Sequence, residues 1–180
     1  LENVDIIHWN NGLWDLCTMV DNENFTPVEL YADEMVRLAG MLPIRDHGDL
    51  PSAQIIAADI LEEALRRHPA LTFPASWRGT GGTFTTLAAI MKGIRWTDRT
   101  YMHGTVLTKD FILRIARDLA DMPLEERRQL PGLQPNRADI IVHGICILIA
   151  VMDRLGIEEI TVSEYGNLDG YVKWRYLNKA

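Results

Sequence analysis

The segment from residue 137 to residue 155 constrains the fold of this chain more than any other. It reads RADIIVHGICILIAVMDRL, and apolar side chains would lie on nearly every side of a helix formed there. Such a helix needs packing partners all around it. Its apolar run is interrupted by His143 and is shorter than the roughly 20 residues that cross a bilayer. We therefore expect a central, buried helix that ends at Gly156 and no membrane partner.

The rest of the chain predicts an α/β fold that is rich in helices and has few strands. Ser52 and Thr108 each precede an apolar helical pattern and are expected to cap the helices that follow. Pro123 opens a short charged turn of helix, and residues 157–164 form a last strand. Strands are also expected at 4–9 and 73–78, and helices at 26–41, at 85–91 and at the C-terminal end around Tyr171.

Residues 43–51, PIRDHGDLP, contain two prolines and a glycine among charged residues. Such a segment is typical of a linker between separately folded parts. We expect residues 1–42 to form one piece and residues 52–180 to form another. The sequence contains no internal repeat.

Composition excludes several classes of function. The chain has 180 residues, of which 47% are hydrophobic, and its net charge of −7 argues against a nucleic-acid partner. Cys17 and Cys146 lie far apart with no CxxC pattern, which favours free thiols, and the five histidines have no metal-ligand spacing. These spacings predict no resident metal. The acidic start has no signal peptide, so a cytoplasmic location is expected.

The stretch RGTGGTFTTLAAI, residues 78–90, places three glycines and four threonines between a strand and a helix. Backbone N–H groups at a helix N-terminus attract phosphate, and glycines let a ligand approach closely. The alternative is a tight turn in which the glycines only permit close packing, and the spacing alone does not decide between the two. The candidate phosphate-binding residues are Gly79, Thr80, Gly81, Gly82, Thr83 and Thr85.

From about Leu50 onward the chain resembles the exopolyphosphatase and guanosine-pentaphosphate phosphohydrolase (Ppx/GppA) family. The resemblance rests on four segments in the order of the family: GTGGTFTTLAAI at 79–90, HGTVLT at 103–108, LPGLQPNRADIIVHGICIL at 130–148 and ITVSEYGNLDG at 160–170. It implies part of an actin-like (ribonuclease H-like) domain, with the glycine stretch at one edge of a phosphate cleft. It also implies polyphosphate or guanosine polyphosphate as substrate, Mg²⁺ with that substrate in an active enzyme, and a homo-oligomer.

Parts of the family's catalytic machinery have no counterpart in this sequence. The Asp-x-Gly phosphate loop, the Gly-Gly-Gly-Ser loop and the glutamate that activates water do not occur in it. Phosphoanhydride hydrolysis needs a positioned water and a base. Glu164 and Asp169 are possible cleft carboxylates, and Asp139 is expected to serve at a helix end or in an ion pair. The sequence identifies no catalytic residue. We therefore expect the chain alone to be inactive.

The first forty residues resemble a different family. VDIIHWNNGLWDL, residues 4–16, is similar to the central block of SGNH/GDSL-type esterases, which have a flavodoxin-like fold. The resemblance implies Asn11 as an oxyanion donor and Gly12 as the residue that allows the turn. The alternative is a plain strand followed by an Asn-Gly turn. No serine lies in a nucleophile motif, so ester hydrolysis is disfavoured, and the chain as a whole is interpreted as a fusion of two partial domains.

Three functions remain open from the sequence. The first is phosphoanhydride hydrolysis through the resemblance to Ppx/GppA phosphatases. The second is a non-catalytic fragment that binds an anion at the glycine stretch or forms oligomers as a scaffold. The third, disfavoured, is an SGNH-type ester hydrolase.

Overall fold

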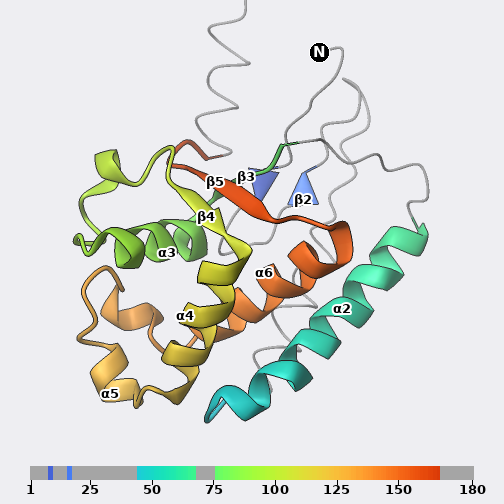
Figure 1. Ribbon diagram of the computed structural model, residues 1–180, viewed down its shortest axis with the longest axis horizontal. Helices are drawn as coiled ribbons and strands as arrows, with labels where there is room; N and C mark the ends of the chain where they lie inside the picture. Colours follow the sequence, from blue (N-terminus) through green and yellow to red (C-terminus); the bar gives the residue numbers. More distant parts are fainter. Residues whose placement is uncertain (1–7, 10–15, 18–43, 68–75, 167–180) are drawn as a thin grey trace, which may run out of the picture.

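The computed structural model describes residues 8–9, 16–17, 44–67 and 76–166. These residues form an α/β structure with one mixed sheet and helices packed against it (Figure 1). The sheet has five strands in the order β2-β1-β3-β5-β4. Their bounds are β1 His8–Trp9, β2 Leu16–Cys17, β3 Arg78–Thr80, β4 Val106–Thr108 and β5 Glu159–Ser163.

The three inner strands run parallel to one another. β1 pairs with β3 and β3 pairs with β5 in parallel, whereas the outer strands β2 and β4 are antiparallel to their neighbours. Thr80 at the end of β3 is in register with Ser163 at the end of β5. The carboxyl ends of β1, β3 and β5 therefore lie on one edge of the sheet, called the carboxyl edge below.

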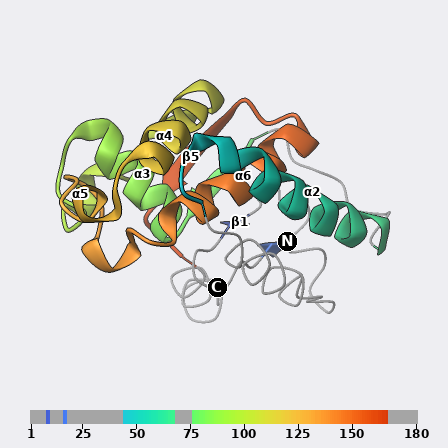
Figure 2. The same cartoon turned by 90° about the horizontal axis from the view of Figure 1, so that it is seen from below.

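The helix α6, Ile141–Leu155, is the centre of the core, as the sequence predicts. Residues such as Ile145, Leu148 and Met152 are fully buried. The helix lies between α2 (Leu50–Arg67) on one side and α3 (Gly82–Lys92) and α4 (Lys109–Asp121) on the other, in both views (Figures 1 and 2). Because its neighbours cover it on several sides, an apolar surface all around it is stabilising.

Several element ends follow the sequence signals. The Thr108 hydroxyl accepts a hydrogen bond from the Phe111 N–H at 3.3 Å, so the predicted cap of α4 is confirmed. Gly156 ends α6 in the left-handed region at φ 66°, also as predicted. The last strand is confirmed as β5, and the short helix after Pro123 is α5, Leu124–Arg127.

The start of α2 differs from the prediction. The helix begins at Leu50, so Ser52 lies inside its first turn and does not cap it. A 3-10 turn, His47–Asp49, precedes it, with the Asp46 carboxylate accepting from the Gly48 N–H at 2.7 Å. Apolar residues from Leu50 onward face the core, so burial extends the helix towards its N-terminus beyond the expected cap.

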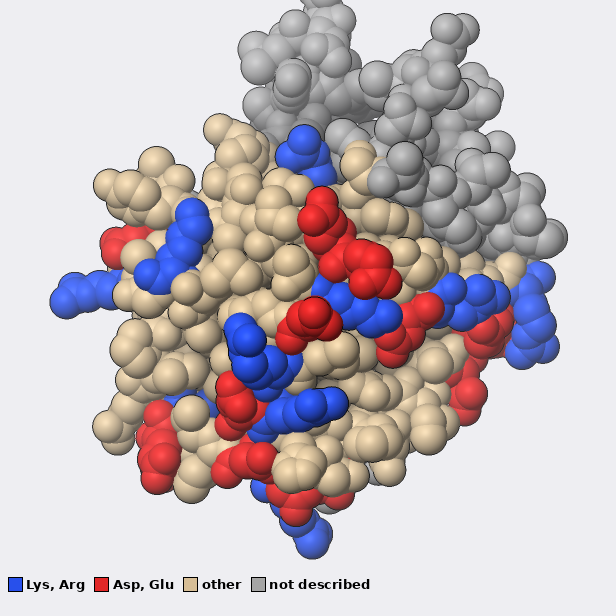
Figure 3. Space-filling view, viewed as in Figure 1, with Lys and Arg blue, Asp and Glu red and all other residues tan. Residues whose placement is uncertain are grey.

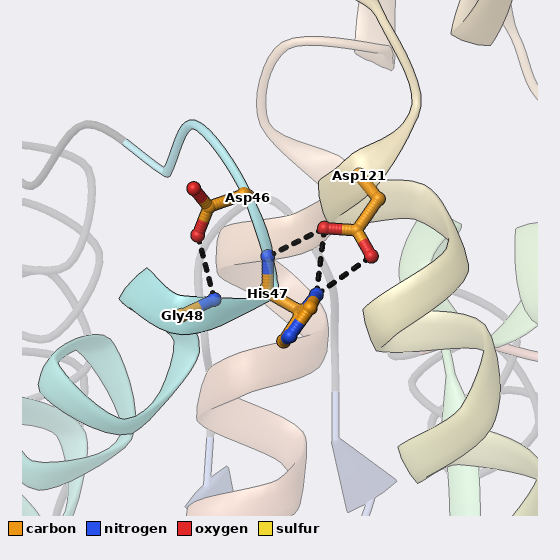
Figure 4. Close-up of polar contacts among 4 residues, drawn as sticks. All are labelled: Asp46, His47, Gly48 and Asp121. Atoms are coloured by element: carbon orange, nitrogen blue, oxygen red, sulfur yellow. Dashed lines mark hydrogen bonds and ion pairs between the residues drawn. The ribbon is translucent and has the colours of Figure 1, made fainter.

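This 3-10 turn is held against the C-terminal end of α4 (Figure 4). The His47 N–H donates to Asp121 Oδ1 at 2.8 Å, and His47 Nδ1 lies 2.7 Å from Asp121 Oδ2. These hydrogen bonds lower the pKa of Asp121, the backbone N–H having the larger effect. Part of the expected linker 43–51 is therefore regular structure held against the helices. The expected division of the chain into two parts at this segment stays a prediction.

The segment before α6 is less helical than expected, because α6 begins at Ile141 and not near residue 137. A 3-10 turn, Pro135–Arg137, precedes it, and Asp139 is exposed ahead of the helix. The buried Arg127 donates to the carbonyls of Met122 and Ala138, each at 2.9 Å. Arg127 thus joins the end of α4 to this segment. Burial lowers its pKa.

The buried interior of the described residues contains one cysteine. Cys146 is a free thiol inside α6, and burial raises its pKa to about 12. It is therefore protonated and unreactive at neutral pH. Among the residues described, no helix is both long and apolar enough to cross a membrane.

Candidate functional site: the glycine turn at the carboxyl edge

The glycine stretch forms a turn from β3 into α3 at the carboxyl edge. Gly81 has φ 99° and ψ 179°, a conformation that is nearly confined to glycine. The Gly81 carbonyl accepts the Thr85 N–H at 3.0 Å and begins the helix, and no side chain caps it. The positive end of the α3 dipole therefore faces this turn, at the edge where open α/β sheets bind their ligands.

The turn is shorter than the sequence suggests. Gly79 and Thr80 belong to strand β3 and are buried, and helix α3 begins at Gly82 instead of Thr85. The pairing of β3 with β5 fixes residues 79 and 80 in extended form, and this long-range contact is not visible in the local sequence. Only Gly81 lies between the two elements.

Two of the candidate residues have a packing role. A Cβ atom on Gly79 would overlap the ring of Phe84, which is fully buried. The Thr83 hydroxyl lies 2.8 Å from the position of a Cβ on Gly144, so α3 and α6 approach closely there. At Gly79 and Thr83 the packing interpretation of the sequence is therefore the one that the contacts support.

Thr80 connects two strand ends. Its hydroxyl and that of Ser163 both donate to the Tyr165 carbonyl, each at 3.1 Å, and the Tyr165 N–H donates to Ser163 Oγ at 3.2 Å. The chain that leaves β5 is thus held directly against the end of β3. The Thr85 hydroxyl donates within its own helix to the Gly82 carbonyl at 3.4 Å.

His103 and Tyr165 lie at the same edge, although the sequence predicts a site role for neither of them. The Glu164 N–H donates to His103 Nδ1 at 3.3 Å, and the two rings meet edge to face with centroids 5.0 Å apart. Both side chains are exposed, while Glu164 is half-buried. The segments HGTVLT and ITVSEYGNLDG contain these residues, but only the pairing of β4 with β5 brings them together.

Three other predicted site residues cannot be placed at this edge. Asp169, Asn11 and Gly12 lie outside the described residues. Glu164 is therefore the one predicted carboxylate that the described part of the chain places here. Within the described ranges no three His, Cys, Asp or Glu side chains come together as a metal site.

The described helices carry charged side chains of both signs on one face of the molecule. Figure 3 shows acidic and basic side chains intermingled over α2, α4 and α6. Several form ion pairs, such as Arg154 with Glu62 and Lys109 with Asp153 at 2.8 Å. Opposite charges at this spacing neutralise each other locally, so this face has no large field of one sign.

The glycine turn lies within a segment that matches a known protein family. The sequence model of the Ppx/GppA phosphatase family matches residues 47–175 of this chain. The chain belongs to the Ppx/GppA phosphatase family. Membership confirms the resemblance that the four sequence segments carry. The match begins inside the segment 43–51 that the sequence suggested as a linker.

Individual relatives agree with the family match. Exopolyphosphatase 2 of Mycobacterium tuberculosis is 31% identical over 134 residues, which cover 69% of this chain and 42% of the relative. A Ppx/GppA family member from Aquifex aeolicus is 26% identical, with a TM-score of 0.65 over 81% of this chain and 48% of that one. The chain therefore spans less than half the length of these relatives.

One solved relative covers more of this chain than the other two. The type II variant structure of the Aquifex aeolicus Ppx/GppA phosphatase covers 95% of this chain and 57% of its own length, with 18% identity and a TM-score of 0.75. β1 and β2 lie in the same sheet as β3. Neither the sheet nor these relatives support an SGNH-like piece or a fusion.

Proposed function

We propose that this chain binds the phosphate groups of polyphosphate or of a guanosine polyphosphate at the glycine turn, as part of a phosphoanhydride hydrolase. Gly81 carries the proposal. Its backbone conformation is one that residues with a side chain rarely adopt, and it lies at the N-terminus of α3 on the carboxyl edge. Membership of the Ppx/GppA family and the similarity to an exopolyphosphatase support a phosphate ligand at this edge.

Binding without hydrolysis is the activity expected of this chain by itself. Hydrolysis of a phosphoanhydride requires a base that positions water. Glu164 is the half-buried carboxylate at this edge, and its backbone N–H donates to His103. The chain therefore contributes one wall of the cleft, and Mg²⁺-dependent phosphate release from polyphosphate is expected to be absent.

The oligomerising scaffold is the weaker alternative. It would use an open edge of the sheet, and β4, Val106–Thr108, is an edge strand. Very short edge strands are poor templates for pairing with a second chain. An ester-hydrolase function has less support still, since neither the fold nor the relatives favour it.

Calorimetric titration with inorganic tripolyphosphate tests the proposed binding. Gly81→Ala is compared with Gly93→Ala at the opposite end of α3, where φ is 62° and a new Cβ would meet nothing within 4 Å. Both substitutions strain the backbone by about 1–3 kcal/mol, but only the first alters the turn. We expect Gly81→Ala to weaken binding at least about tenfold, which is about 1.4 kcal/mol, and Gly93→Ala to leave it unchanged.

Two results would contradict this proposal. One is the absence of binding by the unaltered chain at millimolar tripolyphosphate. The other is an equal loss of affinity in the two glycine variants, which would indicate an effect on folding. Phosphate release that Gly82→Val abolishes would instead contradict the expectation that the chain binds without cutting.

A further inference from the structure

Tyr165 and His103 form an exposed aromatic pair at the carboxyl edge, called the aromatic shelf. Tyr165 is 62% exposed although it directly follows a buried strand end. Its ring meets the His103 ring at 69°, with centroids 5.0 Å apart. An edge-to-face contact of this kind orients one ring with the other and leaves a ring face open for stacking.

The backbone holds the aromatic shelf beside the glycine turn. The Tyr165 carbonyl accepts hydrogen bonds from Thr80, which directly precedes Gly81, and from Ser163. On the other side, the Gly104 N–H donates to the Val162 carbonyl at 2.8 Å, so the loop with His103 is attached to β5 as well. Both rings thus extend from fixed backbone, which lowers the entropy cost of binding against them.

The hydrogen bond at His103 also defines which ring nitrogen can donate. Because Nδ1 accepts the Glu164 N–H, the neutral imidazole carries its proton on Nε2. His103 is exposed, so this N–H is a donor at the surface beside the Tyr165 ring. The aromatic shelf therefore combines a π-face with a hydrogen-bond donor.

Phosphate oxygens accept hydrogen bonds and can use the N–H of His103, but inorganic polyphosphate has no flat ring to stack on Tyr165, whereas a nucleobase has both a flat ring and acceptor atoms. We infer that the aromatic shelf stacks the base of a nucleoside polyphosphate whose phosphates lie at the glycine turn. Tyr165 is then a specificity-determining residue, and His103 positions its ring. The inference rests on the proposed phosphate binding and names the ligand class that this site prefers.

Guanosine 5′-triphosphate and inorganic tripolyphosphate test the inference, because they carry the same number of phosphate groups. Calorimetric titrations compare the unaltered chain with Tyr165→Ala and Tyr165→Phe. Stacking of one base on an aromatic side chain is worth about 1–3 kcal/mol, so Tyr165→Ala should weaken the nucleotide about 5- to 150-fold. Tripolyphosphate affinity should stay unchanged, and Tyr165→Phe should bind both ligands as the unaltered chain does.

Tyr101→Ala is the matched control. Tyr101 is 68% exposed, and Lys92 donates to its carbonyl at 2.6 Å, a bond that the substitution keeps. It should not change the affinity for either ligand. An equal effect of Tyr101→Ala and Tyr165→Ala on the nucleotide would overturn the inference.

Failure of the inference differs from failure of the proposed function. Loss of both ligands in Tyr165→Ala, or loss of neither, overturns the role of the aromatic shelf while tripolyphosphate binding by the unaltered chain still supports the phosphate site. If the unaltered chain binds the nucleotide through Tyr165 but does not bind tripolyphosphate, the proposed function fails and the base site stands. If it binds neither, both fail.

Discussion

The helices around α6 and the carboxyl edge of the sheet are built by different means. Around α6, fully buried apolar side chains such as Leu148 and Ile145 account for the packing. At the carboxyl edge, hydroxyl groups and backbone atoms of Thr80, Ser163 and Tyr165 hold the chain, and aromatic rings remain exposed. The first region is stabilised by burial, whereas the second keeps polar and aromatic groups at the surface where a ligand can reach them.

The difference indicates where stability and function separate in this molecule. Apolar burial is the larger source of stability, at about 25 cal/mol per Å². Hydrogen bonds contribute less each, about 0.5–1.5 kcal/mol, but they fix directions. Substitutions around α6 should therefore act on folding, and substitutions at the exposed part of the carboxyl edge should act on binding.

The largest expected effect is in the helical region. Leu148→Ala leaves a cavity in the fully buried centre of α6 and should lower the free energy of unfolding by about 2–5 kcal/mol. Urea unfolding followed by circular dichroism measures the loss. Ile55→Ala on α2, where the side chain is 60% exposed, should stay within about 0.5 kcal/mol of the unaltered chain. Similar losses in the two variants would refute the contrast.

A smaller effect is expected where the two regions meet, at Gly79. Gly79→Ala would place a methyl group inside the space of the Phe84 ring and should cost about 1–3 kcal/mol of stability. Tripolyphosphate affinity, measured at a temperature where the variant is still folded, should remain unchanged. A variant of normal stability that no longer binds would show instead that Gly79 is needed for approach of the ligand.

The smallest effect is expected at the exposed contact between His47 and Asp121. The pKa of Asp121 is lowered by folding, so this carboxylate stabilises the native state above its ordinary pKa near 3.8. That contribution disappears as the pH falls through the lower native value. Asp121→Asn should therefore melt below the unaltered chain at neutral pH, and the difference should shrink as the pH falls below about 4. Asp118→Asn, on the same helix and exposed, should melt at the temperature of the unaltered chain at neutral pH.

Local signals in the sequence predicted the helical region well. An apolar pattern on all sides gave the place of α6, and Thr108 and Gly156 marked helix ends that the structure confirms. Each of these depends on neighbours in sequence. The predicted cap at Ser52 was wrong, because burial of apolar side chains from Leu50 onward extends α2 beyond this residue.

The carboxyl edge was predicted less completely, because distant pairings build it. The segments around residues 79, 103 and 165 each appear in the sequence, yet nothing local shows that Thr80 reaches the Tyr165 carbonyl. Residue 80 could be placed in a strand only with knowledge of its pairing to Ser163. The family resemblance supplied the phosphate hypothesis, which local spacing left undecided.

The position of β3 in the sheet has a consequence for folding kinetics. Arg78 pairs with His8 on one side and with Thr161 on the other, so both partners lie far from it along the chain. Closing such long loops costs chain entropy before the contacts form, and folds dominated by distant contacts fold slowly. During synthesis the pairing of β3 with β5 can form only after β5 has left the ribosome, whereas α3 and α4 are made earlier. Helices are therefore expected to form first, with the glycine turn completed in the last step of folding.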